Sequence, residues 1–187
     1  MSDAAKILLA LVVLMWAVEV VDVVADARLD QYGIEARDVD GLDGIVTAPF
    51  LHVGFAHLLG NTIPFVIMGL LIAVEGARRL LGVFAIAALV SGLGTWLVAP
   101  EGSIHVGASG VVFGFATYLI ARGWFARRVG QIAIGLVVLV LWGGVLLGGL
   151  QPREGISWQG HLFGAIGGVV AARMLAGRDP EQAPARA

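Results

Sequence analysis

Cysteine is absent from this 187-residue chain, and charged residues are scarce. Without cysteine, the protein can form no disulfide, use no thiolate nucleophile and bind no metal through sulfur. Charged side chains make up 14% of the residues, against about 25% in a typical soluble domain, whereas 58% are hydrophobic. Because so few polar side chains cannot cover a water-soluble surface of this size, the excess apolar surface must face lipid.

The sequence also lacks the patterns that bind nucleic acids, phosphates or zinc. Its net charge is −2, and it contains no basic run, no zinc-type spacing and no phosphate-binding loop. The composition therefore gives no reason to expect a nucleic-acid partner, and the expected environment is the lipid bilayer.

What the chain does contain is six apolar segments, and about 20 mostly apolar residues suffice to cross a bilayer. Allowing a few residues at each end, the segments cover 6–24, 53–74, 80–98, 106–121, 129–150 and 158–176. The predicted fold class is an all-α polytopic membrane protein, with one six-helix domain over 1–178. An acidic loop outside the membrane is expected over 25–49, and a short disordered tail over 179–187.

The distribution of lysine and arginine predicts the orientation of these segments. With a cytoplasmic N-terminus, nine of the twelve basic residues fall on the cytoplasmic side, and only Arg28, Arg37 and Arg153 fall outside. Both termini are then cytoplasmic. This bias fits a bacterial-type plasma (inner) membrane, with an organellar membrane as the alternative.

The first segment has two interpretations, a retained helix or a signal peptide. The sequence Ala25-Asp26-Ala27 resembles a signal-peptidase site. We expect a retained helix, because Glu19 and Asp22 interrupt the apolar run that a signal peptide needs. These two acids are three residues apart on one helix face, and we expect them to reach the membrane interface.

Polar groups inside apolar spans are costly, so each one indicates a candidate functional residue. Six such groups fall on the outer side or in the outer half of the predicted bundle: His52, His57, Asn61, His105, Ser109 and His161. We therefore expect them to meet in one polar pocket that opens to the outer side of the membrane.

Ser109 and His161 form the candidate catalytic pair. Each lies about three residues into its segment, roughly 5 Å below the outer boundary at about 1.5 Å per residue. Glycines spaced four apart on both segments allow the two helices to touch; they are Gly110 and Gly114 on one, and Gly160, Gly164 and Gly168 on the other. A serine hydroxyl next to an imidazole is the minimum for an activated nucleophile. Small-residue packing and helix capping are the structural alternatives.

His57 and Asn61 are four residues apart and share one helix face. Both can donate a hydrogen bond to a developing oxyanion. They can equally bond loop backbone and hold the first loop, and the two roles are compatible. No acidic residue is placed to orient His161, so the sequence predicts a dyad and not a triad.

These motifs occur in a recognisable order on the second, fourth and sixth segments. They read His52-x-x-x-x-His57-x-x-x-Asn61, Gly107-x-Ser109-Gly110 and Gly160-His161-x-x-Gly164-x-x-x-Gly168. The set resembles the rhomboid family of intramembrane serine proteases, over nearly the whole chain.

The resemblance implies a six-transmembrane-helix rhomboid-like bundle in which Ser109 is the nucleophile and His161 the general base. His57, Asn61 and the backbone N–H of Ser109 would form the oxyanion hole. The residues implied to support the site are His52, Gly107, Gly110, Phe113 and Gly164. Phe113 stands where many relatives place a tyrosine that stacks on the catalytic histidine.

The same resemblance implies a substrate class and excludes a cofactor. Substrates would be single-span membrane proteins cut near the outer end of their helix, with no metal and no cofactor required. The fifth segment and residues 151–157 would admit substrate and cover the site. The alternatives are a non-catalytic rhomboid-like binder of membrane proteins and a histidine-rich metal-binding membrane protein.

Overall fold

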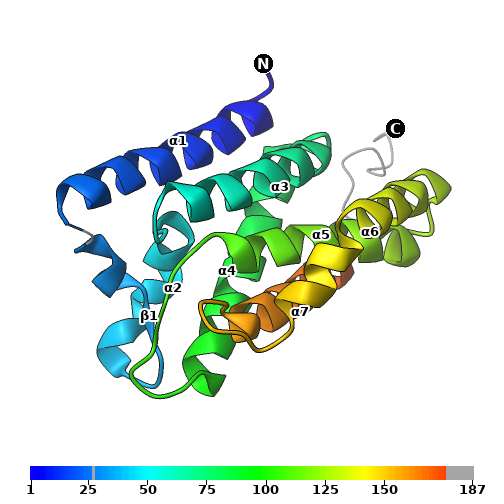
Figure 1. The fold of residues 1–187 in the computed structure, drawn as a ribbon. Coiled ribbons are helices and arrows are strands. Elements are labelled where there is room, and N and C mark those ends of the chain that lie inside the picture. The colour runs from blue at the N-terminus through cyan, green and yellow to red at the C-terminus, as the bar shows by residue number, and fades with distance from the viewer. Residues whose placement is uncertain (27, 176–187) are drawn as a thin grey trace.

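The computed structural model describes residues 1–26 and 28–175, and within them the protein is a bundle of helices (Figure 1). The predicted tail over 179–187 and Ala27 of the signal-peptidase-like sequence lie outside these residues. Six long helices account for most of the described chain: α1 (Asp3–Val24), α3 (Phe55–Ala73), α4 (Ala77–Val98), α5 (Ser109–Ala126), α6 (Val129–Gly149) and α7 (Trp158–Leu175). The predicted all-helical fold class is confirmed.

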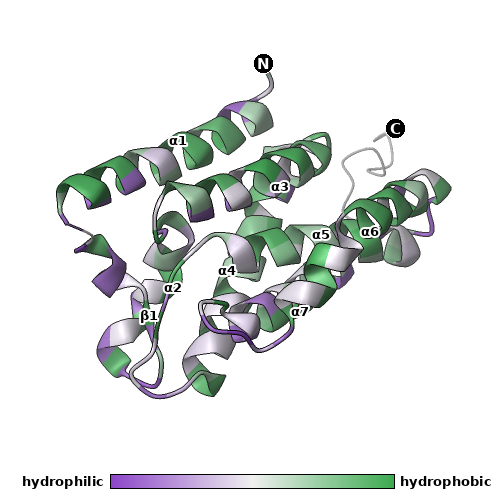
Figure 2. Cartoon of the chain, viewed as in Figure 1, coloured by the Kyte–Doolittle hydropathy of each residue, from purple (hydrophilic) through white to green (hydrophobic). Residues whose placement is uncertain are grey.

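Four of these helices, α1, α3, α4 and α6, are long and apolar enough to cross a membrane on their own. Figure 2 shows hydrophobic colours over most of α1, α3 and α6, with hydrophilic colours in the connecting loops and at a few positions within the helices. Helices α5 and α7 fall outside this group, and they carry Ser109 and His161. The two candidate catalytic residues therefore sit on the helices that depend most on the rest of the bundle.

Helix α5 occupies the centre of the bundle and contacts α3, α4, α6 and α7 (Figure 1). Eleven of its 18 residues are buried, on all sides of the helix, which is the pattern of a helix surrounded by others. It ends at Ala126 and not at 121 as the hydropathy predicted, because Arg122 is buried in an ion pair with Glu75 and does not terminate the helix.

The contact between α5 and α7 depends on glycine. A Cβ atom at Gly164 would overlap the backbone of Gly110, and one at Gly168 would overlap the carbonyl of Gly114. With hydrogen at these positions the two backbones approach directly, as small residues permit in membrane helix pairs. This close approach brings together the ends of α5 and α7 that carry Ser109 and His161.

The segment before α3 is folded, although the sequence predicted only an acidic loop. It contains η1 (Leu29–Tyr32), β1 (Ile34–Glu35), η2 (Val39–Leu42), α2 (Gly44–Thr47) and η3 (Ala48–Phe50). Strand β1 pairs antiparallel with β2 (Ile104–His105), so that Ile34 lies opposite His105. Ile45 packs against α4 at Gly92, where no side chain intervenes. The segment is thus tied to α4 and to strand β2, which precedes Ser109 in the chain.

The prediction that Glu19 and Asp22 reach the membrane interface is wrong. The two residues are 1% and 4% exposed, so both are buried within the protein. The Oδ1 atom of Asp22 accepts a hydrogen bond from the backbone N–H of Leu29 at 2.7 Å. Asp22 therefore fixes the start of η1 and with it the path of the first loop.

A buried ion cluster ties four helices together at the opposite end of the bundle. Glu75, which follows α3, contacts the guanidinium groups of Arg79 on α4, at 3.5 Å, and Arg122 on α5. It also accepts a hydrogen bond from the hydroxyl of Tyr118 at 3.0 Å. Arg79 in turn donates to the carbonyl of Leu175 at the end of α7. This cluster holds α5 and α7 together at the end of the bundle opposite to Ser109 and His161.

Candidate active site

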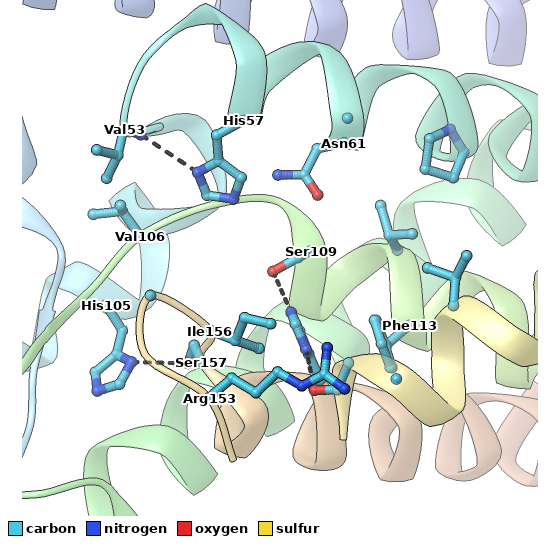
Figure 3. Close-up of a pocket in the computed structure, with 18 of the residues that line it drawn as sticks. Val53, His57, Asn61, His105, Val106, Ser109, Phe113, Arg153, Ile156 and Ser157 are labelled. Atoms are coloured by element: carbon cyan, nitrogen blue, oxygen red, sulfur yellow. Dashed lines mark hydrogen bonds between the residues drawn. The ribbon is translucent and has the colours of Figure 1, made fainter. Parts of the chain in front are cut away.

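A cavity of about 850 Å³ opens at one end of the bundle, between α3, α5, α6, α7 and the loop before α7 (Figure 3). Five of the six polar residues singled out in the sequence line it: His57, Asn61, His105, Ser109 and His161. The sixth, His52, is buried beside the cavity. The polar groups expected to meet in one pocket are thus gathered around this cavity.

Ser109 and His161 are in direct hydrogen-bond contact, with 2.9 Å between the serine Oγ and the imidazole Nε2. The other ring nitrogen, Nδ1, lies 2.8 Å from the carbonyl oxygen of Gly149. Because a carbonyl can only accept, Nδ1 must carry the proton. In the neutral ring Nε2 is then the acceptor, and the Ser109 hydroxyl donates to it, which is the arrangement that a general base requires.

The Gly149 carbonyl takes the orienting position that a carboxylate occupies in a triad, and the sequence analysis missed it. A sequence cannot reveal such a contact from residue type, since every residue has a backbone carbonyl. The absence of a side chain does matter, because a Cβ at Gly149 would lie 2.6 Å from the Phe113 ring and 3.0 Å from His161 Nδ1. Glycine at the end of α6 therefore allows the close contact.

Phe113 stacks on the imidazole of His161. The ring centroids are 4.2 Å apart and the planes differ by 4°. Phe113 follows Ser109 by one helical turn, so it lies on the same face of α5 and forms one wall for the ring. The stacked ring and the Gly149 carbonyl together leave His161 little freedom to rotate.

Hydrogen-bond donors from α3 face the loop that leads to Ser109. Gly107 has φ of +117°, and a Cβ there would lie 2.8 Å from His57 Cε1 and 3.6 Å from Asn61 Nδ2. The Asn61 amide nitrogen is buried and makes no hydrogen bond. His57 Nδ1 accepts from the backbone of Val53 at 3.4 Å, so its Nε2 carries the proton.

The backbone N–H of Ser109 adds a third donor. Ser109 is the first residue of α5, where the amide groups have no partner within the helix and the helix dipole is positive. Donors from a side-chain amide, an imidazole and a helix N-terminus are the set that stabilises an oxyanion. The roles of His57 and Asn61 in that stabilisation stay a prediction.

His52 is buried next to the cavity and does not line it, but it contacts His57, which does. Its Nε2 accepts a hydrogen bond from the backbone N–H of Ala108 at 3.3 Å, next to Ser109. Its ring makes an edge contact with His57, with the centroids 5.2 Å apart. Burial, together with the neighbouring His57, lowers the pKa of His52 to about 4.

This pKa predicts that His52 makes stability depend on pH. The unfolded chain takes up a proton at His52 near pH 6.5, whereas the folded protein resists it until about pH 4. The contribution of His52 to the free energy of unfolding is therefore fully present above pH 6.5. It is lost as the pH falls from 6.5 to about 4, by about 3 kcal/mol in total. His52→Gln keeps an acceptor for Ala108 and does not titrate. The unfolding free energies of the two proteins in detergent should converge as the pH falls from 7.5 to 4; a constant difference would contradict the assignment.

A second serine–histidine contact lines the same cavity. Ser103 Oγ donates to the carbonyl of Pro100, so His105 Nε2–H donates to Ser103, at 2.9 Å. His105 Nδ1 then accepts from the hydroxyl of Ser157, at 2.8 Å. Burial lowers the pKa of His105, which favours this neutral form. The sequence analysis placed His105 in the pocket but missed its partner.

Position distinguishes this second pair from the first. Ser157 precedes α7, and its carbonyl accepts the backbone N–H of His161 at 3.1 Å. The His105–Ser157 contact therefore ties β2 to the start of the helix that carries His161. Ser109, in contrast, begins a long helix beside the donors of α3. Within 1–26 and 28–175, no three histidine or acidic side chains gather as metal ligands.

Comparison with known proteins gives a consistent family match. The Rhomboid domain family matches residues 41–178 of the chain. An uncharacterized protein of Mycobacterium tuberculosis is 44% identical over 176 residues, which span 90% of this chain and 73% of that protein. The chloroplastic Rhomboid-like protein 11 of Arabidopsis thaliana is 33% identical over 144 residues, 70% of this chain and 51% of that protein. Rhomboid protease GluP of Bacillus subtilis is 31% identical over 139 residues, 70% of this chain and 25% of that protein.

Proposed function

The chain belongs to the rhomboid family and is a multi-pass integral membrane protein, and from this premise we propose that it is an intramembrane serine endopeptidase. Proteases of this family act on transmembrane substrates in the bilayer. The proposed substrates are single-span membrane proteins, cut near the outer face of the membrane. The observation that carries the proposal is the 2.9 Å contact from Ser109 Oγ to His161 Nε2, with Nδ1 held by Gly149.

In the proposed reaction, the substrate carbonyl carbon lies against Ser109 Oγ, with its oxygen toward His57, Asn61 and the Ser109 N–H. Oγ attacks the carbon while His161 Nε2 takes the hydroxyl proton, and negative charge develops on the carbonyl oxygen. The C–N bond then breaks as His161 returns the proton to the leaving amine. Water, deprotonated by the same imidazole, hydrolyses the acyl ester and restores Ser109.

The proposed orientation places the cavity at the outer side of a bacterial-type plasma membrane and both termini in the cytoplasm. It is supported by the nine-to-three distribution of basic residues. The cavity opens near one end of the bundle, which would give the site the water that a hydrolase needs.

A fluorophosphonate tests the proposal directly, because it reacts with serines activated as nucleophiles. We expect the detergent-solubilised protein to be labelled at Ser109, the label to disappear in Ser109→Ala, and chelators to have no effect. Ser157→Ala is the matched control, since Ser157 also contacts a histidine in the same cavity, and it should retain the label. Labelling at Ser157 with Ser109 unmodified would overturn the assignment.

A further inference from the structure

The cavity around Ser109 is almost free of formal charge. Its walls consist of apolar side chains, glycines and neutral polar groups, including three histidines. Among the residues that the structure describes, Arg153, in the loop between α6 and α7, is the one lining residue with a formal charge. None of these described lining residues is a carboxylate, and none of the six acids of the first loop is among them.

Most of the hydrogen-bond donors of the Arg153 guanidinium are available to a ligand. Its Nη2 donates to the side-chain oxygen of Gln151 at 2.5 Å, a contact within the same loop. No carboxylate of the described residues lies within ion-pair distance of it. A guanidinium has five N–H donors in one plane, so most remain for a ligand. Figure 3 shows its side chain extended along the cavity below Ser109.

We propose that Arg153 selects substrates that carry aspartate or glutamate close to the scissile bond, an inference that rests on the proposed protease function. Arginine matches a carboxylate with two parallel hydrogen bonds. The apolar walls around it reduce screening compared with open water. Asparagine or glutamine at the same substrate position would offer no charge to pair with.

The geometry allows this contact during cleavage. Arg153 and Ser109 line one cavity, so a substrate whose carbonyl lies at Ser109 extends past the loop at about 3.3 Å per residue. A carboxylate a few residues from the bond then comes within reach of the long arginine side chain. Because Arg153 is exposed, the preference is limited to the strength of a partly solvated ion pair.

The test compares matched substrates in vesicles of zwitterionic phosphatidylcholine. Single-span substrates would carry either aspartate or asparagine at one position, scanned over four residues on both sides of the bond. At one or two positions kcat/KM should be about two- to fivefold higher with aspartate, the range expected for a partly solvated ion pair. In Arg153→Gln that ratio should fall to about 1, and in Arg153→Glu it should fall below 1, because two like charges then repel.

Arg28→Gln is the control, because Arg28 is exposed in the first loop and does not line the cavity. It removes the same charge and should keep the wild-type ratio. Equal rates for aspartate and asparagine at every position, or a preference that survives in Arg153→Gln, would overturn the inference and leave the protease function intact. Failure to cleave any substrate would overturn both.

A guanidinium also binds phosphate, so a lipid headgroup is the competing ligand. A rate that responds to Arg153→Gln only in vesicles with anionic lipid, with no dependence on the substrate residue, would assign Arg153 to the lipid and overturn the inference. Raising the salt concentration should reduce the aspartate-to-asparagine ratio, since the proposed pair is partly exposed to solvent.

Discussion

Ser109→Ala and His161→Ala are each expected to reduce cleavage of a single-span substrate by about 10³-fold or more, and the double variant should be no worse than either. The two side chains share one hydrogen bond of 2.9 Å, and each is useless for covalent catalysis without the other. Without the serine oxygen no acyl ester forms, and without the imidazole its proton has no acceptor. Residual activity would come from the donors around the oxyanion alone.

The measurement is kcat/KM in detergent or vesicles, with unfolding midpoints recorded for each variant. Ser157→Ala is the control for loss of a serine–histidine contact in the same cavity. It should cost less than about tenfold, because Ser157 positions the start of α7 and does not attack substrate. Additive losses in the double variant, or normal cleavage by Ser109→Ala in a folded protein, would contradict the dyad.

Much of the candidate site could be predicted because its parts are fixed by counting along helices. Ser109 and His161 were expected at one depth, and glycine stripes gave their helices a reason to touch. The structure brings the two side chains together through those glycines: Gly110 lies against Gly164, where neither residue has a side chain. A hydropathy pattern and a four-residue spacing are sufficient to predict such contacts.

Contacts made by backbone or by short irregular segments could not be predicted. The Gly149 carbonyl that orients His161 has no signature in residue type. Glu19 and Asp22 are buried, and the Asp22 carboxylate accepts a hydrogen bond from the backbone of Leu29 in the first loop, a contact with an irregular segment that residue type does not reveal. Hydropathy assigned these acids to the interface because it treats each segment as isolated.

The same limit explains the end of α5. Arg122 stops an apolar segment in any hydropathy scale, because a lone charge in a membrane helix is costly. In the folded protein its guanidinium pairs with the carboxylate of Glu75, which is 47 residues earlier in the sequence but adjacent in space. A charge that ends a segment in the sequence is thus part of the helix once its partner is in place.

The glycine contact between α5 and α7 predicts a large effect from one methyl group. Gly164→Ala places a Cβ atom against the backbone of Gly110, which cannot move aside as a side chain could. The helices must separate, and we expect a loss of about 3 kcal/mol in unfolding free energy. Gly110 is next to Ser109 in the sequence, and Gly164 lies about one helical turn after His161. Separating the two helices at these glycines would therefore also separate Ser109 from His161. A displacement of about 1 Å there should lower kcat by about 100-fold.

Gly144→Ala is the matched control, since Gly144 lies within α6 and a Cβ there meets nothing within 4 Å. The same substitution should be neutral or should stabilise the protein by up to about 1 kcal/mol, through the higher helix propensity of alanine. Thermal unfolding and cleavage rates would be measured for both variants. Equal behaviour of Gly164→Ala and Gly144→Ala would show that the α5–α7 contact tolerates a side chain, and that the dyad depends on other contacts. A selective loss in Gly164→Ala would tie the 2.9 Å contact of Ser109 and His161 to hydrogen at position 164.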